Sequence, residues 1–388
     1  MNKKTGLILE HLGEEYERYY NAVVPPIFMN SLHIFETIDD YYDSDKTDKH
    51  TYCYGRVQNP TVRILEEKIA ALEEGCVSYV FSSGMSAAAA AVLASCKTGG
   101  HVICVRNAYG PLQNFLTGYC REHMKIETTF VDGDTVPEFF EAFRDNTQLI
   151  VLESPSSVIF SVQDIRGVSE LAKSRGARVY IDNTFCTPIY QKPLAMGADY
   201  VMHTTSKYMG GHSDLIGGVL TVKDEALGEE IRMLREQLGS IIGPMEGWLI
   251  LRGMRTLEVR VKEHERTAGE IAQYLENHPK VKKVYYTGLT SHPQRELIEK
   301  QQSGSTGLLS FEIDGSLEQA KKFCQSLEVF KIGVSWGGFE SLVMMPYARQ
   351  SEEISRTMRG TSSIIRIHCG LEGAELLIQD LEQGLQKI

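Results

Sequence analysis

Residues 148–182 read QLIVLESPSSVIFSVQDIRGVSELAKSRGARVYID, and this stretch indicates the fold of the chain. Two short apolar runs, Gln148–Leu152 and Arg178–Ile181, flank a segment, Ile165–Ser174, whose apolar residues recur with the spacing of a helix. Near-continuous apolar runs of this length are typical of strands that are buried on both faces of a sheet. The stretch therefore predicts one strand–helix–strand unit of a parallel sheet that helices cover on both sides.

The same alternation extends beyond this unit, from about Ser78 to Val222. Further β-like runs lie at 78–81, 101–105, 126–131 and 200–203, and further helical candidates at 85–96 and 112–123. In open α/β sheets ligands bind at the carboxyl ends of the strands. The polar residues that directly follow each β-like run are therefore the first candidates for chemistry.

The segments on either side of this pattern differ from it. The first 50 residues are irregular and partly acidic, which predicts an N-terminal arm with little core of its own. After Gly243 a helical stretch at 248–275 is followed by strands near 282–286 and 306–313 and by helices at 317–327 and 374–385. The sequence predicts an arm at 1–50, which we expect to make subunit contacts, an α/β domain at 51–243, and a smaller C-terminal α+β domain at 244–388.

Composition excludes several classes of protein. The 388 residues, 42% of them hydrophobic, suffice for two cores, and a net charge of −11 argues against nucleic acid or an anionic membrane as the main partner. The longest apolar run, Met85 to Ala94, is half a membrane span. No cysteine pair has C-x-x-C spacing, so we expect buried free thiols and a cytoplasmic protein, without a disulfide framework or a zinc site.

The first strand end with suitable chemistry is Ser82-Ser83-Gly84-Met85-Ser86, which opens a helix. Free N–H groups and the positive end of the helix dipole suit a phosphate. An ordinary N-cap, with Ser82 or Ser83 at the start of a core helix, explains the same residues, and taken alone this segment favours the cap.

The second strand end is Val179-Tyr-Ile-Asp182-Asn183-Thr184. A carboxylate directly after an apolar strand is costly unless it meets a positive charge, and a protonated ring nitrogen is one such partner. An Asx turn or a helix cap is the alternative explanation of Asp182.

The third strand end, residues 203–214, reads HTTSKYMGGHSD. Lys207 stands among hydroxyls just after a buried strand, where partial burial lowers the pKa of a lysine toward the nucleophilic amine and neighbouring hydroxyls can hold a phosphate. A solvated surface lysine is the alternative. His203 and His212 have no third ligand at suitable spacing, so no metal site is predicted.

Each of these three signals is weak by itself, but they occur in order along one predicted sheet. A phosphate cradle, an acid for a pyridinium and a lysine for Schiff-base formation are together the set that pyridoxal 5′-phosphate (PLP) requires. The sequence therefore predicts PLP as the cofactor.

A larger set of motifs accompanies these strand ends. In order they are Tyr54-Gly-Arg56-Val-Gln-Asn59-Pro60-Thr61, Ser83-Gly84-Met85, Glu153-Ser-Pro155, Asp182-Asn-Thr184, Ser206-Lys207-Tyr208 with Gly211-His212-Ser213-Asp214, and Arg366-Ile-His-Cys-Gly370-Leu371-Glu372. With these motifs the chain, from about Val24 to its end, resembles the Cys/Met-metabolism family of PLP enzymes of fold type I, which comprises cystathionine γ-synthase, cystathionine β- and γ-lyases and methionine γ-lyase.

This resemblance implies roles for individual residues in the cofactor site. Lys207 is the lysine that forms the Schiff base with PLP, Asp182 pairs with the ring nitrogen, and Tyr109 stacks on the ring and takes a proton from the incoming substrate. The phosphate is bound by Ser83, Gly84, Met85, Thr204 and Ser206, and by Tyr54 and Arg56 of a neighbouring subunit. A homo-oligomer is thus implied, a tetramer built as a dimer of dimers.

The resemblance also implies a substrate site for a small sulfur-containing amino acid. Arg366 binds the substrate carboxylate, for which a bidentate guanidinium is suited. Ser335, Trp336, Tyr54 and Ser157 complete the site. Two alternatives stay open, because Tyr54 could be a core aromatic residue and Ser335 a turn residue.

Departures from the family pattern favour one member. Ser157 replaces the Asn of the usual Glu-Ser-Pro-x-Asn-Pro, and Gly110-Pro111 after Tyr109 lacks the Cys of methionine γ-lyases. Residues 334–342, VSWGGFESL, resemble the Ser-Trp-Gly-Gly block of bacterial cystathionine β-lyases, and position 334 is Val where some γ-acting members have an acid. Against this, residues 58–61, QNPT, have the general family form that typical bacterial β-lyases can lack.

On balance these motifs favour a cystathionine β-lyase, which would cleave L-cystathionine by β-elimination to homocysteine, pyruvate and ammonia and could accept cysteine or related thioethers. The alternatives within the family are a cystathionine or methionine γ-lyase and a cystathionine γ-synthase, which is a transferase. A cofactor-free binding protein of the same fold would be expected to lose Lys207 or Asp182, and both are present.

Overall fold

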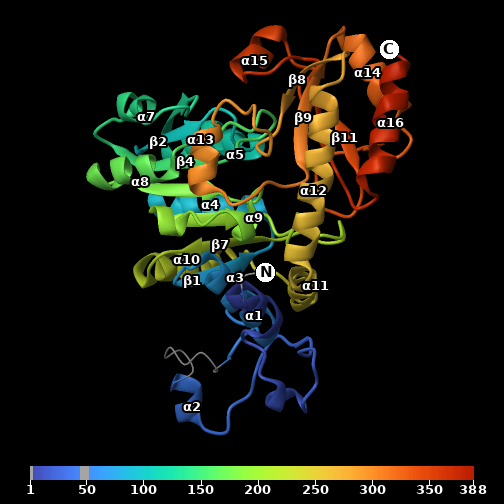
Figure 1. The fold of residues 1–388 in the computed structure, drawn as a ribbon. Helices are drawn as coiled ribbons and strands as arrows, with labels where there is room; N and C mark the ends of the chain where they lie inside the picture. Colours follow the sequence, from blue (N-terminus) through green and yellow to red (C-terminus); the bar gives the residue numbers. More distant parts are fainter. Residues whose placement is uncertain (1–2, 44–51) are drawn as a thin grey trace.

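A computed structural model describes residues 3–43 and 52–388 of the chain. Its centre is a seven-stranded sheet with the order β1-β7-β6-β5-β4-β2-β3 (Figure 1). The strands are β1 (Val77–Phe81), β2 (His101–Val105), β3 (Glu127–Val131), β4 (Thr147–Glu153), β5 (Arg178–Asp182), β6 (Tyr200–His203) and β7 (Gly218–Val222). All pairings are parallel except those of β7, which runs antiparallel to both β1 and β6. The prediction of a mostly parallel sheet is confirmed, and β7 is the strand that it missed.

Helices cover both faces of this sheet because alternate residues of each strand point to opposite sides. In β1, Tyr79 and Phe81 join the hydrophobic cluster beneath α4, whereas Val80 joins the cluster that contains α3. The helices of this region are α3 (Pro60–Glu73), α4 (Gly84–Ser95), α5 (Gly110–Phe115), α6 (Arg121–Met124), α7 (Val136–Ala142), α8 (Ile165–Ser174), α9 (Thr187–Tyr190) and α10 (Glu225–Leu238), with short helical turns at Leu116–Cys120 and Leu194–Met196.

A second sheet follows in the C-terminal part, with the order β10-β11-β12-β9-β8. Its strands are β8 (Val281–Tyr285), β9 (Leu308–Ile313), β10 (Lys331–Ile332), β11 (Leu342–Met344) and β12 (Ile365–His368), and α13 (Arg295–Gln301), α14 (Leu317–Ser326), α15 (Glu352–Thr357) and α16 (Ala374–Gln386) accompany them. Mixed strands and helices were expected here, but β10, β11 and β12 were not.

The long helix expected at 248–275 is two helices, α11 (Pro244–Arg255) and α12 (Leu257–Glu276), which meet at Thr256. A tertiary contact accounts for the break, because a Cβ on Gly253 would lie 2.3 Å from the carbonyl oxygen of Gly210. The end of α11 is thereby held against the loop after β6, and α12 leaves in a new direction (Figure 1).

The N-terminal segment contains more structure than expected. It forms α1 (Lys3–His11), a 3₁₀ turn at Tyr16–Tyr19 and α2 (Ile38–Asp43). Leu9 is buried, and Lys68 of α3 forms a buried ion pair with Glu14 at 3.1 Å. The beginning of the segment is therefore attached to α3.

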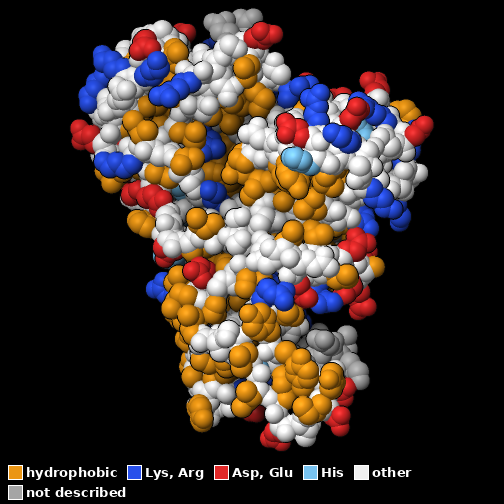
Figure 2. All heavy atoms as spheres, turned by 180° about the vertical axis from the view of Figure 1, so that it is seen from behind, with side chains coloured by type: hydrophobic (Ala, Val, Ile, Leu, Met, Phe, Trp, Pro, Cys, Tyr) orange, Lys and Arg blue, Asp and Glu red, His pale blue; other side chains and the backbone are white. Residues whose placement is uncertain are grey.

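The rest of the arm carries exposed apolar side chains. Figure 2 shows such side chains over the arm, and the exposed large ones are Tyr20, Val23, Val24, Met29, Leu32, Ile34, Ile38, Tyr41 and Tyr42. The division into 1–50, 51–243 and 244–388 stays a proposal, and its first boundary lies outside the described residues.

All eight cysteines lie in the described segments as free thiols, and six of them are buried. Within 3–43 and 52–388, no helix combines the length and the apolar character that crossing a membrane would need.

Candidate active site

Lys207 lies in the loop that joins β6 to β7 and opens into a cavity of about 440 Å³ at the carboxyl end of the sheet. Eight of the residues named from the sequence line this cavity together: Ser83, Gly84, Met85, Tyr109, Thr204, Ser206, Lys207 and Ser335. Five further residues, for which no binding or catalytic role was predicted, line it as well: Ser213, Leu215, Ile216, Val334 and Glu340. Segments far apart in the chain thus meet around one lysine.

The environment of Lys207 shifts its amine toward the neutral form. Its Nζ donates a hydrogen bond to Ser335 Oγ and lies 5.6 Å from the centre of the Trp336 ring. Burial, followed by the positive charge of Arg366, lowers the pKa of Lys207 to about 8, although Asp182 opposes this shift. Lys207 is partly buried in the lining of the cavity, so the alternative of a solvated surface lysine is wrong.

The first turn of α4 has both a capping residue and free backbone N–H groups that could bind a phosphate. Ser83 is the N-cap, since its Oγ accepts a hydrogen bond from the backbone N–H of Ser86 at 3.1 Å. A Cβ on Gly84 would lie 2.1 Å from Thr204 Oγ1, so only glycine lets the first turn of α4 approach Thr204. Gly84 and Met85 have backbone N–H groups that the helix itself does not use. The cap explanation and the phosphate explanation are therefore compatible.

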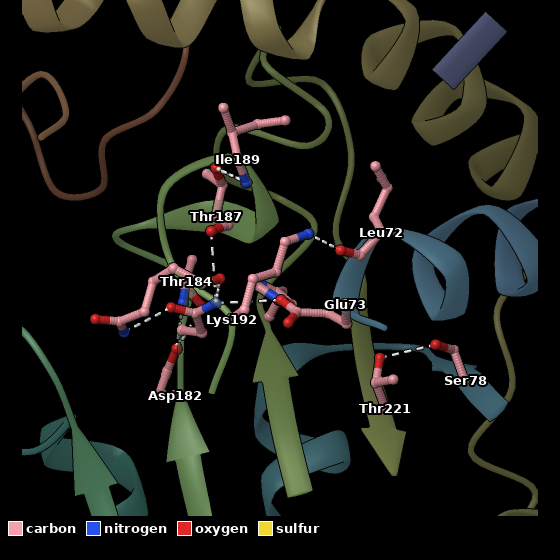
Figure 3. A network of polar contacts seen from close by, with 12 residues as sticks. Leu72, Glu73, Ser78, Asp182, Thr184, Thr187, Ile189, Lys192 and Thr221 are labelled. Atoms are coloured by element: carbon pink, nitrogen blue, oxygen red, sulfur yellow. Dashed lines mark hydrogen bonds and ion pairs between the residues drawn. The ribbon is translucent and has the colours of Figure 1, made fainter. Parts of the chain in front are cut away.

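Asp182 ends β5 and is held by Thr184 (Figure 3). Its Oδ1 accepts hydrogen bonds from Thr184 N at 2.9 Å and from Thr184 Oγ1 at 2.5 Å. Burial raises the pKa of Asp182, while these hydrogen bonds and the charges of His203 and Lys207 lower it. The Asx-turn alternative thus describes the local geometry, and the other carboxylate oxygen stays available to a cation.

Behind Asp182 a buried polar network fixes the neighbouring strand ends. His203 Nε2 is bonded to Glu73 Oε1, to which Asn183 Nδ2 donates at 3.1 Å. Figure 3 shows Glu73 and Lys192 beside this region, with Lys192 reaching the carbonyl of Leu72. His203 therefore has a structural role, as expected.

Glu153 is a further residue of the site, and no role was predicted for it from the sequence. It lies opposite Asp182 at the end of β4, and its carboxylate accepts hydrogen bonds from Tyr109 N at 2.6 Å and Ser157 Oγ at 2.5 Å. Burial and the charge of Asp182 raise the pKa of Glu153 to about 8. The signal was the same as for Asp182, an acid directly after an apolar strand.

Arg366, on β12, approaches the cavity from the second sheet. Its Nη2 lies 2.8 Å from Met344 Sδ, and none of the described ion pairs includes it. Burial lowers the pKa of Arg366 to about 10, which Glu153 and Tyr347 partly offset. An unpaired, largely desolvated guanidinium is suited to an incoming carboxylate.

The turn after β10 carries Ser335 and Trp336 to Lys207. Ser335 has φ +91° and Gly337 has φ +88°, and a non-glycine residue in this region is strained by about 1–3 kcal/mol. Val334 is 80% exposed at the mouth of the cavity. Glu340 Oε1 accepts a hydrogen bond from Ser213 Oγ at 2.5 Å, which connects this turn to the loop of Lys207.

The other six residues named from the sequence do not line this cavity: Tyr54, Arg56, Ser157, Asp182, Trp336 and Arg366. Arg56 donates a hydrogen bond to the carbonyl of Glu236 at 2.7 Å and lies 5.7 Å from the Tyr54 ring centre, and neither residue lines the cavity of Lys207. Tyr54 is 46% exposed, so the core-aromatic alternative is wrong.

The described residues fit the cofactor that the sequence predicts. The close approach of Gly84 to Thr204 leaves the first turn of α4 accessible to a phosphate. Lys207 has a lowered pKa, and Asp182 lies in the same site with a free carboxylate oxygen. A phosphate, an aldehyde and a protonated ring nitrogen are the three groups of PLP that these features suit.

Comparisons with known proteins agree with this site. Residues 6–386 match the family described as Cys/Met metabolism PLP-dependent enzyme. The chain is 38% identical to cystathionine gamma-lyase of Bacillus subtilis over 393 residues, covering all of both chains, and 38% identical to cystathionine beta-lyase MetC of the same species over 353 residues, covering 90% of each.

A solved structure shows the same fold. The crystal structure of metB from Corynebacterium glutamicum superposes with a TM-score of 0.92 at 34% identity and covers 100% of this chain and 98% of that one. The fold is that of the fold type I PLP enzymes, as predicted. The chain belongs to the Cys/Met metabolism family of PLP-dependent enzymes.

Proposed function

We propose that this protein is a carbon–sulfur lyase that cleaves L-cystathionine by β-elimination to homocysteine, pyruvate and ammonia. The observation that carries the proposal is the turn beside Lys207, which presents Trp336 to the lysine and an exposed Val334 to the cavity mouth. The relatives include both cystathionine β-lyases and γ-lyases at similar identity, so the choice depends on this turn.

Cofactor binding is proposed to use the strand ends described above. Gly84 and Met85 offer backbone N–H groups to the phosphate, and Ser83, Thr204 and Ser206 lie around them. Asp182 carries the negative charge for the ring nitrogen. When bound, PLP supplies an electron sink that stabilises negative charge at the substrate Cα.

Substrate binding is proposed to use Arg366 for the α-carboxylate. Ser157 and Tyr109 are both fixed by Glu153, so the two loops that carry them keep a constant separation across the site. Tyr109 is 47% exposed, and burial followed by the charges of Asp182 and Glu153 raises the pKa of its phenol, so its proposed uptake of a proton from the incoming ammonium would require the positive charge of a bound cofactor to stabilise the phenolate. Trp336 forms an apolar wall next to the lysine.

Proton transfer is assigned to Lys207. Its Nζ takes the Cα proton and then delivers a proton to the departing sulfur, and the lowered pKa of Lys207 suits both steps near neutral pH. A γ-elimination needs a further proton removal at Cβ.

A homo-oligomer, a tetramer by the family resemblance, and a cytoplasmic location complete the proposal. The exposed apolar side chains of the arm support subunit contacts, since soluble monomers rarely expose such surface. Tyr54 and Arg56 are proposed, by the family resemblance, to complete the site of a neighbouring subunit, and within this chain Arg56 binds the carbonyl of Glu236.

The test is product identity from L-cystathionine with added PLP. Homocysteine plus pyruvate is expected. Cysteine plus 2-oxobutyrate would overturn the β-lyase assignment in favour of γ-elimination. A parallel assay with an O-acylated homoserine and a thiol measures carboxylate release, which would indicate a transferase.

A further inference from the structure

We infer that His368 is a positioning residue for Lys207, acting through the turn at residues 335–338. His368 is the last residue of β12 and is 1% exposed. The inference rests on the proposed role of Lys207 and adds a second layer of residues behind it.

His368 holds the turn by its backbone. Its Nε2 lies 3.1 Å from Gly337 N and 3.1 Å from the carbonyl oxygen of Gly338. A neutral imidazole accepts from the N–H in one tautomer and donates to the carbonyl in the other. In either tautomer the ring therefore binds the turn at one of two adjacent peptide groups.

The turn is in direct contact with the backbone of the lysine. A Cβ on Gly337 would lie 2.7 Å from Tyr208 N and 3.0 Å from Lys207 Cα, so the chain approaches as closely as glycine permits. The preceding residues, Ser335 and Trp336, provide the two side chains that contact Lys207 Nζ. A shift of the turn thus changes the surroundings of the lysine nitrogen.

The conformation of Ser335 requires such support. At φ +91° it occupies a region that persists only where surrounding contacts over-determine it. His368 supplies one of these contacts through Gly337 and Gly338. Glu340 supplies another through Ser213.

The His368 ring is fixed from below by aromatic packing. Tyr208 follows Lys207 in the chain, and its ring centre lies 5.9 Å from His368 and 5.4 Å from Trp336. His264 packs at 5.1 Å from His368 and donates from Nδ1 to the carbonyl of Cys369 at 2.8 Å. His368 thereby contacts both the turn and the residue after the lysine.

We do not assign His368 the role of a catalytic base. Burial lowers the pKa of His368 to about 3, so the ring is uncharged near neutral pH. His368 is also not among the residues that line the cavity. The contribution of His368 is to hold the turn, and with it the surroundings of Lys207, in place.

The chain allows a direct optical test, because it contains only Trp248 and Trp336. In a W248F background all tryptophan fluorescence of the PLP-loaded enzyme comes from Trp336. We compare H368A and the conservative H368Q, whose amide can still bond the turn. The matched control is H101A, which removes another buried histidine that is bonded to Thr147 and Thr129, remote from the cavity.

For H368A we expect acrylamide quenching of Trp336 to rise about twofold or more, the pH midpoint of the visible band of the cofactor-bound lysine to move, and kcat to fall about tenfold or more with KM within about twofold. H368Q should restore most of the wild-type values of quenching, pH midpoint and kcat. H101A should change none of them.

Wild-type fluorescence, pH midpoint and kcat in folded H368A, or equal changes in H101A, would overturn the inference. If H368A does not fold, the same readouts on H368Q and H368N decide, since Asn cannot reach the turn as Gln does. If L-cystathionine proves not to be the substrate, the proposed function fails, while the fluorescence and pH midpoint still test the role of His368.

Discussion

Glu153 and Asp182 stand opposite each other at the ends of β4 and β5, so two carboxyl groups lie side by side beneath the cavity. Because the two carboxyl groups are close together and buried, ionising both of them at once is unfavourable. Burial and the charge of Asp182 raise the pKa of Glu153, and burial raises that of Asp182, so the two carboxyl groups titrate as a pair that favours one shared proton in the unliganded protein.

This pairing predicts a pH dependence of stability. Because the folded-state pKa of Glu153 lies above its ordinary value, the stabilising contribution is full below about pH 4.5 and is lost as the pH rises through about 8. In E153Q this component should be absent. Urea denaturation of both proteins at pH 6 and pH 8.5 measures it, and a difference between them that does not change with pH would contradict the prediction.

The lowered pKa of Lys207 predicts how the cofactor-free protein takes up PLP. Only the neutral amine reacts, so the loading rate should rise with pH and level off above about 8. Removing the positive charge in R366M should move the midpoint upward, and removing the negative charge in D182N should move it downward, each by on the order of one unit. Stopped-flow absorbance follows the rate. Shifts of the same sign in both variants would disprove this account of the pKa.

The proposed role of Arg366 predicts that its replacement weakens substrate binding without a matching loss of protein stability. In R366K one of two charge-assisted hydrogen bonds to the substrate carboxylate is lost, and KM should rise about 10- to 100-fold. The matched control is R235K, because Arg235 is even more buried (5% exposed) but is paired within the protein, with hydrogen bonds to Glu66 at 2.6 Å and to the carbonyl of Val57 at 2.9 Å. We expect R235K to lower the free energy of unfolding with KM nearly unchanged. An equal rise of KM in both variants would argue against the carboxylate role.

The position of Tyr54 and Arg56 predicts subunit complementation. K207A and R56A should each be nearly inactive, since one lacks the lysine and the other the phosphate contact from the neighbouring subunit. Unfolding and refolding them together at equal amounts should give about a quarter of wild-type activity, because half of the random dimers are mixed and each has one complete site. Activity no higher than that of the two variants separately would mean that the site is built within one chain.

Much of the first sheet could be predicted because its information is local. Asp182 and Lys207 directly follow apolar runs, and the carboxyl ends of neighbouring parallel strands meet at one edge. The strand β7 was missed because an apolar run of five residues does not indicate whether the strand lies parallel or antiparallel to its neighbours in the sheet.

The second half of the site could not be read in the same way. The contacts of Glu340 with Ser213 and of His368 with Gly337 join residues that are 127 and 31 positions apart. The break at Thr256 likewise depends on the approach of Gly253 to Gly210, a contact between distant segments. The spacing of apolar residues in the sequence indicates which residues are buried. It does not indicate which loops come into contact.

The pairing of β12 with β9 and β11 has a further consequence. Arg366 pairs with Ser310 and Met344, and His368 pairs with Leu308 and Leu342, so both side chains project from the same face of the strand. A slip of one residue in this register would turn both away together. The guanidinium proposed to bind the substrate and the imidazole under the lysine therefore depend on one strand register, and a loop insertion that shifts β12 would displace both and abolish recognition and catalysis together.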